Sequence, residues 1–359
     1  MPGSEGGREI LSLKAGEWVE VRSQTEILTT LDARACFDNL PFMPEMLQFS
    51  GQRFRVYKRS DKTCDPAHTP WSIRRMKNSV HLEGVRCTGE GHGGCQAGCL
   101  IWWNEAWLKR VENHSVPAGS LGPVRADQVS TGESDREGGI LAPCHTTDSE
   151  GQVVYSCQAT EIRNFTSYMS WWSPGQYVRD LRSGNLKSGH SKGSKSERLL
   201  ELVLGIFQVC RAFLISFFTE QRHLNYPPVV GTLEKTAAEG LGLQTGELVK
   251  VRTKEEIIET LDKNSRNRGL LFDGEMLRYC DGIYRVLRRV DRIIDEKTGK
   301  MMSMKHPCIV LEGVVCQSDF HRLCPRAIYP YWRENWLKRV ESYPVRRTPE
   351  QAAETCDRS

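Results

Sequence analysis

Cysteine and histidine are the residues of this sequence with the most specific chemistry, and several lie close together in its first third. They are Cys64, Cys87, His92, Cys95 and Cys99. Thiolate sulfur and imidazole nitrogen are ligands that zinc prefers, and four thiolates also suit an iron–sulfur cluster. These residues predict a metal centre, with zinc as the first expectation and iron or an iron–sulfur cluster as the alternative.

The stretch from Cys87 to Cys99 has the character of a metal-binding loop. Seven residues and then three separate its cysteines, and five of the intervening residues are glycine. Glycine gives a loop the backbone freedom to wrap an ion. No pair of cysteines in the chain is separated by two residues, so the spacing indicates a metal site without identifying the metal.

A second set of the same residue types lies near the other end of the chain, at Cys280, Cys308, Cys316, His321 and Cys324. Cys308 and Cys316 flank an expected strand over 309–315, which would hold them about 26 Å apart if it were straight. One ion could bind both only if this strand bends near Gly313. We therefore expect a second metal site that uses such a bend or takes a ligand from elsewhere.

One trio of ligand types occurs twice with the same spacing. The trios are Cys87, His92 and Cys95, and Cys316, His321 and Cys324. In both, four residues and then two separate the ligands, while the intervening residues differ. We predict that each trio converges on one ion, with its sulfur and nitrogen atoms within about 4 Å of one another. The alternative is that these thiols only pack, since free cysteine is among the most buried residue types.

The elements that must position these residues are themselves repeated. Residues 16–22 (GEWVEVR) return at 246–252 (GELVKVR), 45–47 (EML) at 275–277, and 107–112 (WLKRVE) at 336–341. Many ordered identities, at an offset of 230 residues and then of 229 after a small length change, indicate an internal duplication. Each half opens with the alternation of a half-buried strand, continues with a short helix, and reaches a hairpin. In the second half Thr253 is the expected helix cap.

The opening strand, the hairpin and the closing Trp-Leu-Lys-Arg-Val segment resemble SH3-like barrels. The chain as a whole, including 155–161 (YSCQATE), resembles an uncharacterised bacterial family of cysteine-rich proteins with tandem SH3-like barrels. The resemblance implies a mainly β fold with short helices (α+β), in which two duplicated SH3-like small barrels are joined by a linker and one long apolar helix. It implies no function, because barrels of this kind host many unrelated activities.

We expect five segments along the chain. They are a first SH3-like metal-binding module over 10–114, a flexible linker over 115–153, a connector with an aromatic segment and the apolar helix over 154–230, a second SH3-like metal-binding module over 244–342, and a tail over 343–359. A further thiol pair, Cys144 and Cys157, lies in the linker and connector, where it could complete a site, form a redox pair or pack.

The apolar run over 199–218 contains Glu201, Gln208 and Arg211, which are costly inside a bilayer. A buried or interface helix is therefore favoured, and membrane association through 199–218 is possible but not favoured. The N-terminus lacks the apolar region of a secretory signal, so we expect a cytoplasmic protein. In a reducing compartment its 13 cysteines suit metals better than disulfides.

The composition and motifs limit the function. With 49 basic and 45 acidic residues the net charge is +4, which does not predict nucleic-acid binding. The motifs of phosphate-binding loops and zinc proteases are absent. Our first expectation is a metal-stabilised binding or adaptor protein whose partner is a protein or polymer. The alternatives are a metalloenzyme or redox protein that uses a Cys/His metal centre or iron–sulfur cluster, and a nucleic-acid-associated module.

Overall fold

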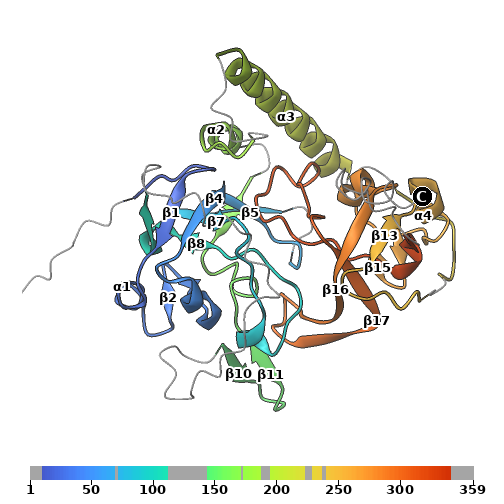
Figure 1. Cartoon of the computed structure of the whole chain (residues 1–359), viewed down its shortest axis with the longest axis horizontal. Helices are drawn as coiled ribbons and strands as arrows, with labels where there is room; N and C mark the ends of the chain where they lie inside the picture. The colour runs from blue at the N-terminus through green and yellow to red at the C-terminus, as the bar shows by residue number, and fades with distance from the viewer. Residues whose placement is uncertain are drawn as a thin grey trace, which may run out of the picture.

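The computed structural model describes residues 10–68, 72–111, 144–170, 173–186, 195–222, 229–236 and 240–340. In these residues the chain is mainly β, with several small sheets and few helices (Figure 1). The expected class, mainly β with short helices, is confirmed at this level. The tail over 343–359 and most of the linker lie outside the described residues.

The first half is built around a five-stranded antiparallel sheet in the order β8-β7-β4-β1-β9. Its elements are β1 (Trp18–Val21), α1 (Gln24–Leu28), β2 (Cys36–Phe37), β3 (Leu40–Pro41), η1 (Pro44–Phe49), β4 (Arg53–Arg59), β5 (Lys62–Cys64), β6 (Ile73–Arg75), β7 (Ser79–Leu82), η2 (Glu90–His92), β8 (Trp103–Asn104), η3 (Glu105–Trp107) and β9 (Leu108–Arg110). The short elements η1, η2 and η3 are 3-10 helices.

The second half has a four-stranded sheet in the order β17-β16-β13-β18. Its elements are β13 (Leu248–Val251), α4 (Lys254–Ile258), β14 (Arg266–Asn267), β15 (Leu270–Leu271), η5 (Gly274–Tyr279), β16 (Ile283–Ile294), β17 (Met301–Leu311), η6 (Glu334–Trp336) and β18 (Leu337–Arg339). Strand β13 pairs with β16 and β18 as β1 pairs with β4 and β9. The expected cap is confirmed, because the Thr253 hydroxyl accepts from the Glu256 N–H.

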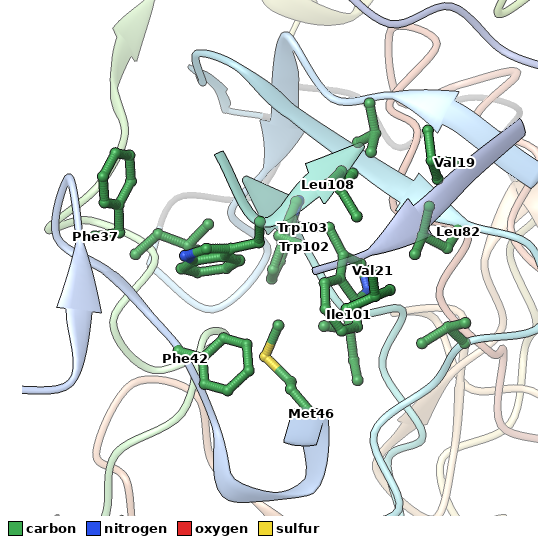
Figure 2. Close-up of a cluster of buried hydrophobic side chains, with 14 of the residues drawn as sticks. Val19, Val21, Phe37, Phe42, Met46, Leu82, Ile101, Trp102, Trp103 and Leu108 are labelled. Carbon is green, nitrogen blue, oxygen red and sulfur yellow. The ribbon is translucent and has the colours of Figure 1, made fainter. Parts of the chain in front are cut away.

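Aromatic side chains fill the core of each half. In the first half Val19 and Val21 point inward from β1 (Figure 2). Phe42 meets the ring of Trp107 edge-on at 5.1 Å between centroids. Phe272 meets Trp336 in the same way at 5.2 Å. Such contacts add to the apolar burial that stabilises the sheets. The loops on either side of these cores are therefore held in fixed positions.

The connector lies against both halves. It contains β10 (His145–Thr147), β11 (Val153–Tyr155), β12 (Ser167–Met169), α2 (Pro174–Arg182) and α3 (Lys195–Arg222). Strand β12 extends the small sheet of β5 and β6, and Val154 forms a bridge with Lys300 of the second half. The flexible linker predicted over 115–153 is thus corrected at its end, where β10 and β11 form a hairpin (Figure 1).

Helix α3 corresponds to the predicted long apolar helix, but that prediction needs correction. Charged and polar residues interrupt the helix, and no described helix is long and apolar enough to cross a membrane. Arg211 lies 3.6 Å from Asp319 of the second half, and Phe213 contacts the ring of Tyr177 on α2. Other apolar side chains, such as Phe207, are exposed, so much of its apolar surface is not buried in the chain.

Candidate metal centres

In the first half, a glutamate, a cysteine and a histidine come together beside the core. Glu45 lies on η1, Cys87 follows β7, and His92 ends η2. The Glu45 Oε1 atom lies 3.0 Å from His92 Nδ1 and accepts a hydrogen bond of 3.0 Å from Cys87 Sγ. One ligand atom from each residue lies within 4.8 Å of the others. We call these three residues the first group.

The first group is buried and has unused polar atoms. The side chains of His92 and Glu45 are 1% and 2% exposed. Glu45 Oε2 and both ring nitrogens of His92 are buried without a well-directed hydrogen bond, although Glu45 and Cys144 lie beside the ring. Buried polar atoms without partners are costly, and these atoms are available as ligands for a metal ion. Carboxylate, thiolate and imidazole are together a donor set that fits zinc.

Charge is already organised within the first group. Burial alone would lower the pKa of His92, but the neighbouring Cys144 and Glu45 side chains raise this pKa to about 10. Burial alone would raise the pKa of Glu45, but the neighbouring His92 ring brings this pKa below its ordinary value. Burial raises the pKa of the Cys87 thiol. A bound cation would replace the protons on His92 and Cys87. Its positive charge would then stabilise the thiolate of Cys87 and the carboxylate of Glu45.

The second half carries an equivalent group, formed by Glu275, Cys316 and His321. His321 Nδ1 lies 3.4 Å from Cys316 Sγ and 4.0 Å from Glu275 Oε1. Glu275 Oε2 is buried without a hydrogen-bond partner, as is the matching Glu45 oxygen. The backbone N–H of Phe320 donates to Glu275 Oε1 and holds that carboxylate in place. We call these residues the second group.

The second group is more open than the first. The His321 side chain is 22% exposed, and its Nε2 lies 3.5 Å from Asp273 Oδ2. Burial alone would lower the pKa of His321, but hydrogen bonds with Asp273 and Cys316 raise it well above its ordinary value. Burial raises the pKa of Cys316 despite the nearby histidine. The thiol is therefore not activated for nucleophilic attack by its surroundings alone.

Two of the three members of each predicted trio come together. Cys87 with His92, and Cys316 with His321, are brought together as expected. Their third members are not cysteines but Glu45 and Glu275. The predicted Cys95 and Cys324 lie outside both groups: Cys95 Sγ accepts from the Ile294 N–H at 3.4 Å, and Cys324 Sγ from the Cys64 N–H at 3.1 Å.

The other predicted ligands have separate positions. Cys64 packs with Cys324, Ile73 and Met169 in a small cluster between the halves. Cys280 packs against the second core, and Cys308 is buried beside Val290. A turn is present at Gly313, with a φ of 73°, but it does not bring Cys308 into the second group. Cys99 and Cys95 line a cavity that Cys87 and His92 of the first group also line.

Glycine shapes the loop that carries His92. A Cβ atom at Gly91 would lie 2.8 Å from Glu45 Oε2, closer than real Cβ contacts allow. Gly89 and Gly93 at the two ends of η2 have φ values of 79° and 62°, which favour glycine. The glycines of this loop therefore allow it to lie against the Glu45 carboxylate.

Comparison with known proteins gives no match: no family model, curated protein or solved structure is similar enough to this chain to be assigned to it. The chemistry of the two groups is therefore the basis on which a function can be proposed.

Proposed function

We propose that this chain is a metal-stabilised binding or adaptor protein, in which two duplicated SH3-like modules each hold a metal ion, with zinc as the first expectation. The proposal rests on one observation. The same glutamate–cysteine–histidine group recurs at matched positions of the sequence repeat. If these residues only packed in the core, there would be no reason for both copies to keep three different ligand types together while the loops between them changed.

The burial of the first group supports a structural role for its ion. An ion there would join η1 to the loop after β7. Because the ligands are not assembled in an unfolded chain, the free energy of metal binding adds to the free energy of unfolding. Each module would thereby gain the rigidity that exposed loops need to contact a protein or polymer partner in the cytoplasm.

The openness of the second group supports a second candidate, a metalloenzyme. Three protein ligands leave a fourth position of a tetrahedral zinc ion to water, the arrangement of catalytic zinc sites. Asp273 beside His321 would then orient the imidazole, as carboxylates beside metal ligands do. This candidate is tested by adding a small anion to the cobalt-substituted protein and recording its visible spectrum. An open site would exchange its water for the anion and change the spectrum, and a closed site would not.

Metal content tests the main proposal. We expect metal at both groups in protein purified without chelator, and loss of about half of the zinc in both His92→Ala and His321→Ala. His81→Ala is the matched control, because His81 is equally buried in the first half but bonds the Ile101 carbonyl outside the group. Unchanged zinc content in both histidine variants, or loss of zinc in His81→Ala, would contradict the proposal.

A further inference from the structure

Helix α3 carries an exposed apolar face at the outer edge of the molecule (Figure 1). The helix has 28 residues, which is about 42 Å at 1.5 Å per residue. Val203, Phe207 and Leu214 are all exposed, and Phe207 reaches 66%. A single exposed apolar residue is ordinary, but a continuous row along one helix marks an interaction surface.

The exposed side chains of this helix follow a heptad. Val203, Phe207, Cys210, Leu214 and Phe217 are separated alternately by four and three positions, and all five are exposed. This alternation keeps side chains on one face of a helix, in the a and d positions of a coiled coil. We call these five residues the α3 seam.

The helix contacts its own chain on the opposite side. Ala212 is buried, and a Cβ atom at Gly205 would meet the Leu181 side chain of α2 at 3.0 Å. Gly205 and Ala212 are seven positions apart and take the f position of the same heptad, which points away from the a and d positions. The packing of α3 on its own chain therefore leaves the seam accessible.

Two further contacts fix the orientation of the helix. Arg211 lies 3.6 Å from Asp319 of the second half, and the ring of Phe213 meets that of Tyr177 on α2 at 6.1 Å between centroids. Arg211 and Phe213 are the residues on either side of Ala212 in the chain. The helix is therefore held from both sides with its seam facing outward.

The seam suits a second copy of the same helix. An interface around a two-fold axis brings the same surface of both copies together, so this surface must be complementary to itself. The seam meets that condition because it contains no charged residue, which would face its own copy across the axis. The partner must also be a helix of similar length, and α2, the next longest of the described helices, has only 9 residues.

The exposed area is sufficient for a dimer. Leu204 and Ile206 beside the seam are about half exposed. Together with the seam they present about 600 Å² in one copy, since a whole side chain of this size presents about 150–200 Å². Two copies would bury about 1,200 Å², which reaches the range of stable protein interfaces.

We infer that two copies of this chain associate through the α3 seam. None of the ligands of the two metal groups lies on α3, so the dimer goes beyond the proposed function and does not depend on it. Cys210 is the middle residue of the seam. A two-fold axis through the centre of the seam therefore places the two Cys210 thiols near each other, whether the helices run parallel or antiparallel.

Sedimentation equilibrium of the full chain tests the inference. We expect the mass of two chains at micromolar concentration. Phe207→Glu with Leu214→Glu should raise the dissociation constant at least 100-fold, because four carboxylates would be buried in the seam. Met302→Glu, at an exposed apolar position on β17, is the control and should leave the dimer intact. The zinc content should be the same in these variants as in the unmodified protein.

Crosslinking locates the interface. Among the cysteines that the structure describes, Cys210 alone is exposed. A short bis-maleimide joins two thiols by addition, without an oxidant. It should link two copies of the unmodified protein and fail to link Cys210→Ser. A link that persists in Cys210→Ser would place a different thiol at the contact and contradict the central position of Cys210.

Three other outcomes would overturn the inference. The mass of a single chain up to the solubility limit would exclude the dimer. A dimer that persists in Phe207→Glu with Leu214→Glu, with circular dichroism showing unchanged helix content, would place the contact on another surface. A monomer that sediments with vesicles of phosphatidylcholine and phosphatidylserine, and loses this binding in the same variant, would assign the seam to a membrane surface. If the variant loses helix content, Phe207→Gln with Leu214→Gln provides the same test without added charge.

Discussion

The missing side chain of Gly91 sets the distance between the loop of His92 and the carboxylate of Glu45. In Gly91→Ala the new Cβ would begin 2.8 Å from Glu45 Oε2, and the carboxylate would move away because it is the end of a flexible side chain. We expect zinc affinity at the first group to fall by about 10- to 100-fold, as for other changes beside metal ligands. Competition with a chromophoric chelator measures this affinity.

Gly175→Ala is the control for that substitution. Gly175 lies in α2, and a Cβ there would meet only the Arg179 side chain at 3.5 Å, an ordinary contact. Its zinc affinity should match that of the unmodified protein. Equal affinity in Gly91→Ala would mean that Glu45 is not a ligand, and the first group would be reduced to cysteine and histidine.

The glutamates show how far residue-level prediction could go. Cys87 and His92 were predictable because few other roles explain their types and spacing. Glu45 could not be recognised as a ligand from the sequence, because glutamate is common on protein surfaces and because Glu45 lies far from Cys87 in the sequence. The signal was present nevertheless: Glu45 and Glu275 occupy matched positions of the repeat and are both buried. A buried acid that recurs with a ligand pair should be counted as a ligand.

At the scale of elements, matched ion pairs fix the short helices α1 and α4. Hydrogen bonds with Lys109 and Ser23 hold the pKa of Glu26 at about 2, and hydrogen bonds with Lys338 and Thr253 do the same for Glu256. Because these pKa values are lower when folded, the stabilisation is present above the unfolded pKa and is lost as pH falls toward 2. In Glu26→Gln the free energy of unfolding should therefore fall less between about pH 5 and pH 2 than it does in the unmodified protein.

Chemical denaturation at several pH values measures the effect. Glutamine keeps the capping geometry of Glu26, so the change removes charge and leaves the helix start intact. Glu83→Gln, at an exposed turn, should leave the pH profile unchanged. A Glu26→Gln profile that follows the unmodified protein down to pH 2 would show that the pair with Lys109 adds nothing to stability.

Helix α2 is tied to the first half by a buried ion pair. Lys62 Nζ lies 2.5 Å from Asp180 Oδ2, and both side chains are less than 5% exposed, at 2% and 4%. Removing one partner of such a pair leaves a buried charge without compensation, at a cost of about 3–5 kcal/mol. We expect Lys62→Met to lower the free energy of unfolding by this amount and Lys62→Met with Asp180→Leu to recover most of it, measured by chemical denaturation. A double variant as unstable as the single one would contradict this explanation.

At the scale of the whole molecule, the sequence indicated two similar halves but not how they meet. The repeat is visible because matched strands have matched patterns, and β1 and β13 confirm those patterns. The contacts between halves join residues that do not match. Arg86 stacks on Tyr329 at 3.9 Å, and Cys64 meets Cys324. Because each of these contacts occurs only once in the chain, the sequence repeat contains no sign of it. The length of the connector also does not show how close together the two halves lie.

Arg326 is the residue on which this junction depends most. It is 1% exposed, pairs with Glu296 at 2.5 Å, and lies over the Trp102 ring of the first half at 5.3 Å. In Arg326→Met the Glu296 carboxylate loses its cation and Trp102 loses its cation–π contact, at a cost of about 3–5 kcal/mol. Because the contact with Trp102 joins the two halves, we expect unfolding to become less cooperative as well as easier.

Native-state hydrogen exchange tests this coupling strand by strand. In the unmodified protein, the amides of β1 and β13 should open with similar free energies, since one cooperative unit includes both. In Arg326→Met the two strands should separate, with one half opening before the other. Arg285→Met is the control, because Arg285 is 53% exposed and its 3.9 Å pair with Glu312 is worth little. If β1 and β13 remain equally protected in Arg326→Met while the free energy of unfolding falls, the two halves are held together by contacts other than this buried arginine.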